Sequence, residues 1–165
     1  MSLLLSFVFA HALNFTSPSI SSEIGVGDTL KSISVRDSIV DYAKTFLGSP
    51  YKYAQASPSG FDCSGFTWYV FNHFRVQIPR SSQDYATLGM RVTLETCRKG
   101  DIILFTGTNP KEKRVGHVGI IITNPGEPLK FIHSSSSDNH SGVVVTDYYN
   151  SRYSIRFIGV CSVLP

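Results

Sequence analysis

Apolar residues recur at helical spacing in two stretches of the first half of the chain. Residues 34–48 carry one such stripe, and Ser34 followed by Asp37 three positions later is typical of a capped helix start. A second stripe covers residues 63–74, after a loop rich in Gly, Ser and Pro. A short third helix is expected at residues 79–89. These patterns predict a helical first half.

Beyond residue 100 the pattern changes to short apolar runs separated by polar turns, which is typical of strands. Helices followed by a meander of short strands favour an α+β domain, in which N-terminal helices pack on an antiparallel sheet of about five strands. A chain of 165 residues is most simply one such domain, which we place at residues 34–165. The five strands are expected at residues 101–105, 116–123, 129–134, 142–146 and 154–160.

The N-terminal residues have a pattern of their own. A short apolar run at residues 3–10 leads into Ala10-His11-Ala12, a small-x-small sequence that is typical of a cleavage site. We therefore interpret residues 1–12 as a secretory signal peptide, too short to span a bilayer, and residues 13–33 as a leader or linker. A frayed apolar N-terminus is the alternative, because Met1-Ser2 supplies no basic residue.

Export would place the protein outside the cell, in the periplasm or in the cell envelope. No cysteine directly follows the apolar run, so neither a lipid anchor nor a stable membrane anchor is expected after signal removal. The formal charge of +3 is too small, and the basic residues are too scattered, to indicate nucleic-acid binding. We expect a monomer that needs no cofactor.

Cys63 stands in the first turn of the second predicted helix. Unpaired backbone N–H groups and the positive end of the helix dipole gather there, and both favour the thiolate, which is the nucleophilic form. A buried structural cysteine is the alternative, since free cysteines are among the most buried residues. Cys97 and Cys161 could pair and leave Cys63 free, or all three could be reduced.

A nucleophilic cysteine needs a base and a group that orients the base. His117 and His133 lie on consecutive predicted strands that a turn joins, so they are expected to be neighbours that can fill these two roles. The same two histidines and Cys63 could instead be three ligands of a zinc ion. A fourth ligand is not evident in the sequence, and we predict no metal site.

An ordered set of motifs now becomes informative. Tyr51, residues 60–66 (Gly-Phe-Asp-Cys-Ser-Gly-Phe), Pro79-Arg80-Ser81-Ser82, residues 99–105, residues 116–120 and His133 follow one another along the chain. This set resembles the NlpC/P60 family of cell-wall peptidases, over residues 35–162. The order of cysteine before histidine resembles the peptidase branch of the family, whereas the circularly permuted relatives place histidine first.

The resemblance implies a papain-like fold in which the Cys63 helix packs on an antiparallel sheet that carries both histidines. It implies that Cys63 is the nucleophile and that His117 is the general base and later the acid. It also implies that His133 orients His117 and that the Tyr51 hydroxyl helps to bind the oxyanion. Proximity to His117 would generate the thiolate, and the two groups can exist as an ion pair near neutral pH.

The implied substrate is the stem peptide of peptidoglycan, cut between D-γ-glutamate and diaminopimelate (or Lys). Asp62, Ser64 and Ser82 are the expected substrate-binding residues. Asp62 is also the natural N-cap of its helix, and its carboxylate would oppose a thiolate beside it. Ala54-Gln55 stands where the family usually has a Gly-Gly pair, which leaves the shape of this loop open.

Two other functions are compatible with the same sequence. One is an enzyme of this fold with another amide substrate, such as an amidase, which the identity of its products would reveal. The other is a non-catalytic domain that binds the cell wall, for which replacing Cys63 would leave binding unaltered. The presence of Cys63, His117, His133 and Tyr51 together favours the peptidase.

Overall fold

The structure is a computed structural model that describes residues 34–109, 111–137 and 140–165. These residues belong to one compact unit, Ser32–Pro165. The signal peptide expected at residues 1–12 and the leader expected at residues 13–33 lie outside the described residues. Within the described part of the chain, no helix has the length and apolar character needed to cross a membrane.

Both predicted α-helices are present and begin where the sequence indicates. Helix α1 spans Val35–Lys44, and its N-cap Ser34 accepts a hydrogen bond from the backbone N–H of Asp37. Helix α2 spans Cys63–His73. The short third helix is also present, as the 3₁₀-helix η1 (Ser82–Thr87) of six residues.

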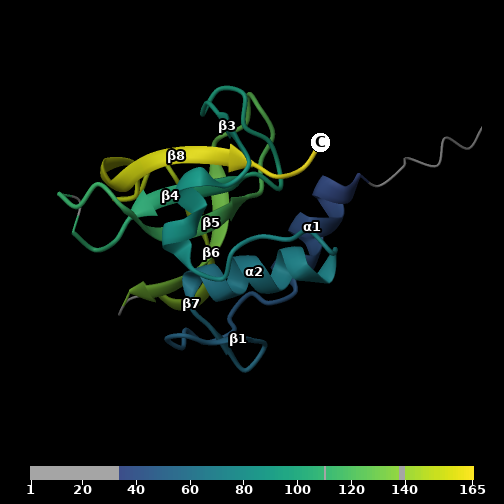
Figure 1. Cartoon of the computed structure of the whole chain (residues 1–165), viewed down its shortest axis with the longest axis vertical. Helices are drawn as coiled ribbons and strands as arrows, with labels where there is room; N and C mark the ends of the chain where they lie inside the picture. Colours follow the sequence, from purple (N-terminus) through teal and green to yellow (C-terminus); the bar gives the residue numbers. More distant parts are fainter. Residues whose placement is uncertain (1–33, 110, 138–139) are drawn as a thin grey trace, which may run out of the picture. The chain divides into compact units, whose positions relative to one another are not determined.

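Six antiparallel strands form the main sheet, in the order β3-β8-β4-β5-β6-β7 (Figure 1). A small second sheet pairs β1 (Ala56–Ser57) with β2 (Gly60–Phe61). The α+β class is therefore confirmed, with one main-sheet strand more than expected. The main-sheet strands are β3 (Met90–Val92), β4 (Ile102–Thr106), β5 (Val115–Ile121), β6 (Lys130–Ser137), β7 (His140–Asp147) and β8 (Phe157–Ser162).

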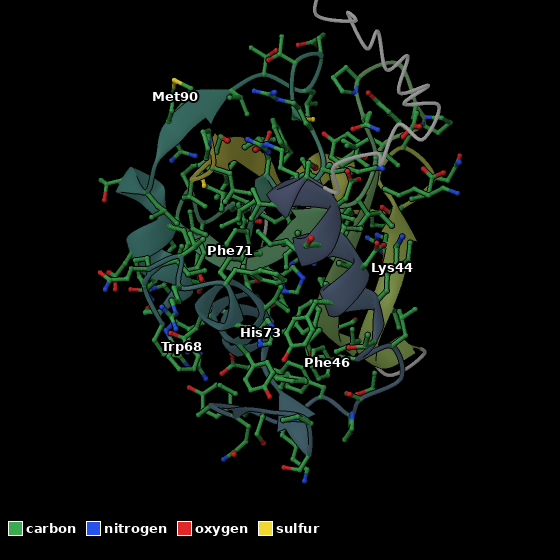
Figure 2. All side chains as sticks on the ribbon, turned by 90° about the vertical axis from the view of Figure 1, so that its right-hand side faces the viewer. Lys44, Phe46, Trp68, Phe71, His73 and Met90 are labelled. Carbon is green, nitrogen blue, oxygen red and sulfur yellow. The ribbon has the colours of Figure 1, made fainter. Side chains whose placement is uncertain are left out.

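The predicted meander holds for β4 to β7 but not for the last strand. Strand β8 begins after a 3₁₀ turn at Ser154–Arg156 and lies between β3 and β4, on the other side of the sheet from β7. Val160 and Cys161 are both fully buried, one on each face of the sheet, so β8 needs an interior position. Strand β3, which holds Met90 (Figure 2), is a short exposed edge that sequence periodicity did not reveal.

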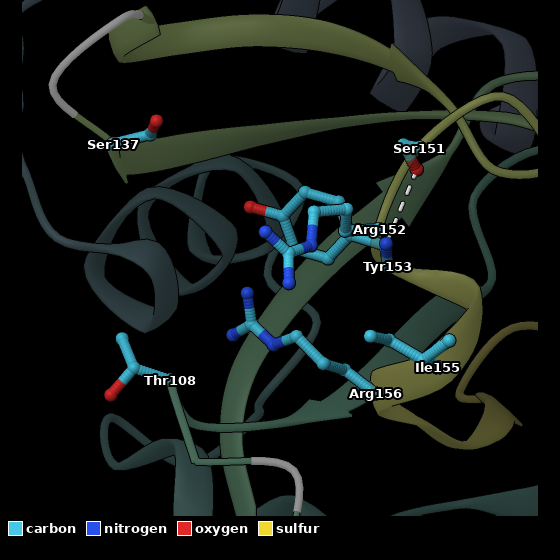
Figure 3. Close-up of a pocket in the computed structure, with 7 residues that line it drawn as sticks. All are labelled: Thr108, Ser137, Ser151, Arg152, Tyr153, Ile155 and Arg156. Atoms are coloured by element: carbon cyan, nitrogen blue, oxygen red, sulfur yellow. Dashed lines mark hydrogen bonds between the residues drawn. The ribbon is translucent and has the colours of Figure 1, made fainter.

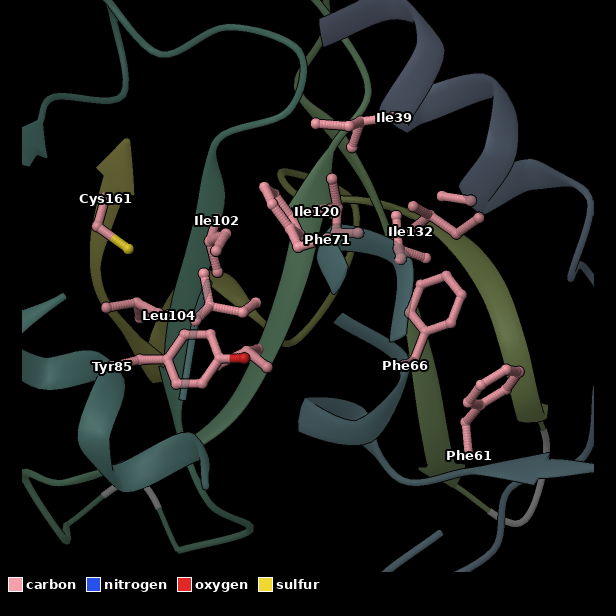
Figure 4. Packing of buried hydrophobic residues seen from close by; sticks show 14 of the residues in the cluster. Ile39, Phe61, Phe66, Phe71, Tyr85, Ile102, Leu104, Ile120, Ile132 and Cys161 are labelled. Atoms are coloured by element: carbon pink, nitrogen blue, oxygen red, sulfur yellow. The ribbon is translucent and has the colours of Figure 1, made fainter. Parts of the chain in front are cut away.

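Each face of the sheet has its own hydrophobic cluster. Ile102 packs in the cluster on the helix side, together with Phe66 and Phe71 from α2 (Figure 4). The next residue, Ile103, belongs to the cluster on the opposite face. Cys161 belongs to the first cluster and Cys97 to the second, so the sheet separates the two thiols. All three cysteines are free, so Cys97 and Cys161 do not form a disulfide.

Arg36 anchors α1 to the sheet through a buried ion pair. Its Nη1 lies 2.8 Å from Oδ1 of Asp101, the residue just before β4. The same guanidinium donates to the carbonyls of Lys99, Leu164 and Pro165, so it also ties down the C-terminal residues. Because both charges are buried, removing either Arg36 or Asp101 would leave the other unpaired and lower the stability of the fold.

We expect the Arg36→Met variant to lose about 3 kcal/mol of unfolding free energy, because it leaves the Asp101 carboxylate buried and unpaired. Urea denaturation measures this loss. The matched control is Arg114→Met, which removes an exposed pair with Glu112 of similar length, 2.9 Å. The control should lose less than about 1 kcal/mol. Equal losses in the two variants would contradict the anchoring role of Arg36.

Candidate active site

The N-terminus of α2 fixes the position of Cys63. Asp62 caps the helix, and its Oδ1 accepts a hydrogen bond of 2.6 Å from the backbone N–H of Gly65. Gly65 has to be a glycine, because a Cβ there would lie 2.1 Å from the carbonyl oxygen of Gln55. The first turn of α2 is thus pressed against the preceding loop, with the Cys63 side chain partly exposed beside it.

Arg80 neutralises the carboxylate of Asp62. Its two Nη atoms lie 2.9 Å and 2.7 Å from Oδ1 and Oδ2 of Asp62 in a bidentate pair. Nη1 also donates to the hydroxyl of Ser64, and Nη2 donates to the carbonyl of Gln55. The residues predicted to bind substrate, Asp62 and Ser64, therefore form one network with Arg80, a residue to which sequence reasoning gave no role.

Opposing effects act on the pKa of the Cys63 thiol. Burial and the nearby Asp62 carboxylate raise this pKa, whereas hydrogen bonds from the backbone amides of Val118, Ser64 and Cys63 itself lower it. The raising effects are the larger ones, so the pKa lies above its usual value. The amide of Val118 comes from β5 and directly follows His117, which places the sulfur beside that histidine's strand.

The two predicted histidines are joined by a hydrogen bond. Nε2 of His117 on β5 lies 2.8 Å from Nδ1 of His133 on β6, and Nε2 of His133 lies 2.9 Å from Oγ1 of Thr146 on β7. The approach of the two strands depends on Gly119, where a Cβ would meet the Phe131 ring at 2.7 Å. The predicted neighbourhood of His117 and His133 is confirmed.

Tyr153, from the segment between β7 and β8, covers the histidine pair. Its ring stacks on His117 at 5.4 Å and meets His133 edge-on at 5.1 Å. The guanidinium of Arg156 lies 4.9 Å from the centroid of the Tyr153 ring. Both imidazoles are consequently buried beneath a cationic side chain.

Burial lowers the pKa of both imidazoles, and the positive charge of Arg156 adds to the effect. The pKa of His133 falls to about 3, and that of His117 lies well below its usual value. The thiol pKa of Cys63 is raised at the same time, so these shifts favour the neutral thiol and the neutral imidazole in the unliganded pair. Both shifts disfavour a resting ion pair between Cys63 and His117, because burial outweighs the helix N-terminus.

The backbone of Tyr51 pairs with the segment that leads into Cys63. It forms an isolated parallel bridge with Phe61, two residues before Cys63. Burial is the main cause that raises the pKa of the Tyr51 phenol, followed by the proximity of Cys63 and Asp62. Ala54 holds the left-handed backbone conformation, with a φ of 58°, which glycine adopts more easily.

A cleft of about 690 Å³ opens over this group. It contains every predicted catalytic and substrate-binding residue except the two buried histidines, and Gly116 at its wall directly precedes His117. Its lining residues are Tyr51, Tyr53, Ala54, Asp62, Cys63, Ser64, Pro79, Arg80, Ser81, Ser82, Gln83, Asp84 and Gly116.

Sequence reasoning missed the groups that surround these residues. Arg80 lies inside a quoted motif, and its position before Ser81-Ser82 was the available signal. Tyr153, Arg156 and Thr146 carried no signal, because their roles arise from contacts across the sheet. Throughout the described ranges, no cluster of three or more His, Cys, Asp or Glu side chains is arranged to hold a metal ion.

Comparison with known proteins gives consistent matches. A sequence model described as the NlpC/P60 family matches residues 48–162. The chain is 34% identical over 136 residues to the gamma-DL-glutamyl hydrolase of Bacillus subtilis, a match covering 80% of this chain and 29% of the relative. It is 30% identical over 129 residues to the murein DD-endopeptidase MepS/murein LD-carboxypeptidase of Escherichia coli, covering 75% of this chain and 63% of the relative.

The fold is similar to that of solved structures. The crystal structure of an NlpC/P60 family protein from Bacillus cereus aligns with a TM-score of 0.71 and 32% sequence identity. This alignment covers 80% of this chain and 41% of that one. The chain spans less than two thirds of the length of each of these relatives, so the match concerns this domain.

Stability is expected to fall when the pH is lowered from about 6.5 to about 3, because the unfolded chain binds a proton at His133 that the folded protein does not. The slope for one such histidine is about 1.4 kcal/mol per pH unit. Between these pH values, the unfolding free energy of His133→Gln should therefore change less steeply with pH than that of the original protein, by about 1.4 kcal/mol per pH unit. Urea denaturation at several pH values measures the difference, and identical slopes would contradict it.

Replacing Arg80 should make Cys63 less reactive. In Arg80→Gln the Asp62 carboxylate is no longer paired, so the thiol pKa should rise and alkylation by iodoacetamide at pH 7–8 should slow several-fold. Cys97 and Cys161 are buried, so the initial rate reports Cys63. Arg98→Gln, which removes an exposed guanidinium elsewhere, is the charge-matched control. A rate in Arg80→Gln equal to the control would exclude this effect.

Proposed function

The chain belongs to the NlpC/P60 family, and from this premise we propose that it is a cysteine endopeptidase that hydrolyses peptidoglycan stem peptides. The scissile bond we assign is the one between D-γ-glutamate and diaminopimelate (or Lys). One observation carries the proposal: the Cys63 sulfur lies at a helix N-terminus and accepts a hydrogen bond from the backbone amide of Val118. Val118 directly follows His117, which is itself hydrogen-bonded to His133.

His117 acts as the general base through its Nδ1. Its Nε2 is already engaged with His133, so Nδ1 is the nitrogen left to accept the thiol proton. This assignment makes Nε2–H of His117 the donor to His133 and Nε2–H of His133 the donor to Thr146. The chain of hydrogen bonds therefore selects the tautomer of His117 that can act as a base.

Because the thiol and the imidazole rest in their neutral forms, the proton moves to His117 as the sulfur attacks the carbonyl carbon. The carbonyl oxygen becomes an oxyanion, for which the Cys63 backbone N–H and the Tyr51 hydroxyl are the donors. Collapse breaks the C–N bond, His117 returns its proton to the leaving amine, and a thioester remains on Cys63.

Water completes the cycle. His117 takes a proton from the water molecule while the water oxygen attacks the thioester carbonyl carbon. Collapse of the tetrahedral intermediate breaks the C–S bond, and the same proton returns from His117 to the sulfur of Cys63. The products are a free carboxylic acid and the amine released in the first half. The oxyanion donors serve both steps, since both pass through a tetrahedral intermediate.

Asp62, Ser64 and Ser82 are proposed to bind the acyl side of the substrate. Oδ1 of Asp62 accepts hydrogen bonds from Gly65, Ser64 and Arg80, whereas Oδ2 accepts one bond from the described residues, from Arg80. Oδ2 is therefore the oxygen available to a substrate ammonium group. Ser82 stands at the cleft wall at the start of η1, where its hydroxyl can meet the peptide.

The names of the relatives support the substrate class and leave the bond to experiment. One relative is a gamma-DL-glutamyl hydrolase, and another is a murein DD-endopeptidase and LD-carboxypeptidase. Action on murein also supports a location in the cell envelope or periplasm. The proposal of a monomer whose partners are peptidoglycan peptides rests on the same reasoning.

Digestion of purified muropeptides, with products identified by mass spectrometry, tests the function. The protein should release fragments cut after D-glutamate, and Cys63→Ala should lower the rate by about 10³-fold or more. The matched control is Cys97→Ser, which alters a buried thiol on the far face of the sheet and should retain activity.

Other outcomes separate the alternatives. Cleavage at a different amide, dependent on Cys63, would replace the assigned bond. Folded protein that cleaves no muropeptide, and whose binding to peptidoglycan is the same in Cys63→Ala, would favour a non-catalytic domain.

A further inference from the structure

A second hollow, of about 390 Å³, is lined in part by Tyr153, the residue whose ring stacks on His117. Figure 3 shows it between the segment that joins β7 to β8 and the ends of two strands, with Arg152 and Arg156 turned toward its interior. Hydroxyl groups complete the wall, and the mechanism above uses none of these side chains. The lining residues are Thr108, Ser137, Ser151, Arg152, Tyr153, Ile155 and Arg156.

The hollow brings two positive charges together without an acidic partner. No carboxylate lines it, and neither Arg152 nor Arg156 forms an ion pair with any residue that the structure describes. Arg156 is held in place by a bond of 2.8 Å from Nη2 to the carbonyl of Thr106 and by its stacking on Tyr153. Its Nε is buried and has no hydrogen-bond partner among the described residues.

Two guanidinium groups at one hollow repel each other, and an anion between them would remove that cost. A guanidinium with free N–H groups matches the two oxygens of a carboxylate. The hydroxyls of Ser137 and Thr108 supply further hydrogen-bond donors for the same group, whereas the Ser151 hydroxyl already donates to the carbonyl of Tyr148. The chemistry of the lining therefore fits a carboxylate ligand.

A third depression lies between the hollow and the Cys63 cleft and shares lining residues with each of them. It shares Ser82, Gln83 and Gly116 with the cleft and shares Thr108 with the hollow. The path between them runs past Gly116, the residue next to His117. This depression, whose wall also carries Glu112 and Arg114, is the route by which a peptide across Cys63 would extend toward the arginine-lined hollow.

The direction of the chemistry decides which part of the substrate arrives there. The group that protonates the leaving amine is His117, so the leaving side of the substrate lies on the histidine side of Cys63. The hollow is on that side, since Tyr153 forms part of its wall and also stacks on His117. The acyl side extends in the other direction, toward Asp62 and Arg80.

We propose that this hollow is a subsite in which Arg152 and Arg156 bind a carboxylate on the leaving side of the substrate. The proposal rests on the peptidase function and adds a specificity determinant to it. The leaving peptide of a stem-peptide substrate begins with an amine and ends in a carboxylate, so it offers the required group. Substrates whose leaving side ends in an amide should be bound less well.

A binding experiment tests the subsite independently of catalysis. Isothermal titration of the Cys63→Ala protein uses two probes, L-lysyl-D-alanine and L-lysyl-D-alaninamide, which differ only in the terminal carboxylate. The carboxylate probe should bind about tenfold more tightly than the amide. This preference should fall to about twofold or less when Arg152→Gln or Arg156→Gln is added, and Arg98→Gln should preserve it.

Inorganic phosphate distinguishes a substrate subsite from a general anion site. Arginine-dependent binding of phosphate, together with equal affinities for the two dipeptides, would overturn the proposal. Equal affinities without phosphate binding, no binding of either dipeptide, or a carboxylate preference that survives both arginine variants would overturn it as well.

A kinetic measurement addresses the same residue in the active protein. With Cys63 intact, Arg152→Gln should raise KM about tenfold for a substrate with a leaving-side carboxylate and change kcat less than about twofold. The corresponding amide substrate should be unaffected. A fall in kcat for both substrates would indicate a general structural effect and contradict the subsite, whereas loss of all turnover in the unmodified protein would concern the peptidase proposal alone.

Discussion

The carboxylate of Asp62 is the interaction on which the geometry of the site depends. It caps α2 and so fixes the backbone N–H of Cys63, but it also places a negative charge beside the sulfur. Arg80 offsets that charge with two hydrogen bonds and holds the carbonyl of Gln55 as well, which ties the loop to the helix. Without Arg80, the same cap would disfavour the thiolate that nucleophilic attack requires.

The histidine pair reflects a balance between position and basicity. Burial beneath Tyr153 holds the two imidazoles in one arrangement, in which hydrogen bonds join His117 to His133 and His133 to Thr146. The same burial and the charge of Arg156 disfavour the imidazolium. A base of this kind is neutral before the substrate binds and takes the proton only during the attack, so orientation contributes more than resting charge.

Charge is distributed unevenly between the Cys63 cleft and the arginine-lined hollow. At one end the Asp62–Arg80 pair is nearly neutral and offers a carboxylate oxygen to an ammonium group, whereas the other end carries two arginines without a described acidic partner. A peptide with an amino group at one end and a carboxylate at the other would complement both ends. The two ends also set the direction in which such a peptide lies across Cys63.

The sequence by itself determined the local features. These features depend on neighbours along the chain, and they include the caps Ser34 and Asp62 and the strand pattern. The structure confirms both caps and the proximity of His117 to His133. Tertiary structure alone decided the place of β8, the contacts of Tyr153 and Arg156, and the pKa shifts of Cys63 and His117. These features arise from burial and from contacts between residues far apart in sequence, whose desolvation and charge no local pattern records.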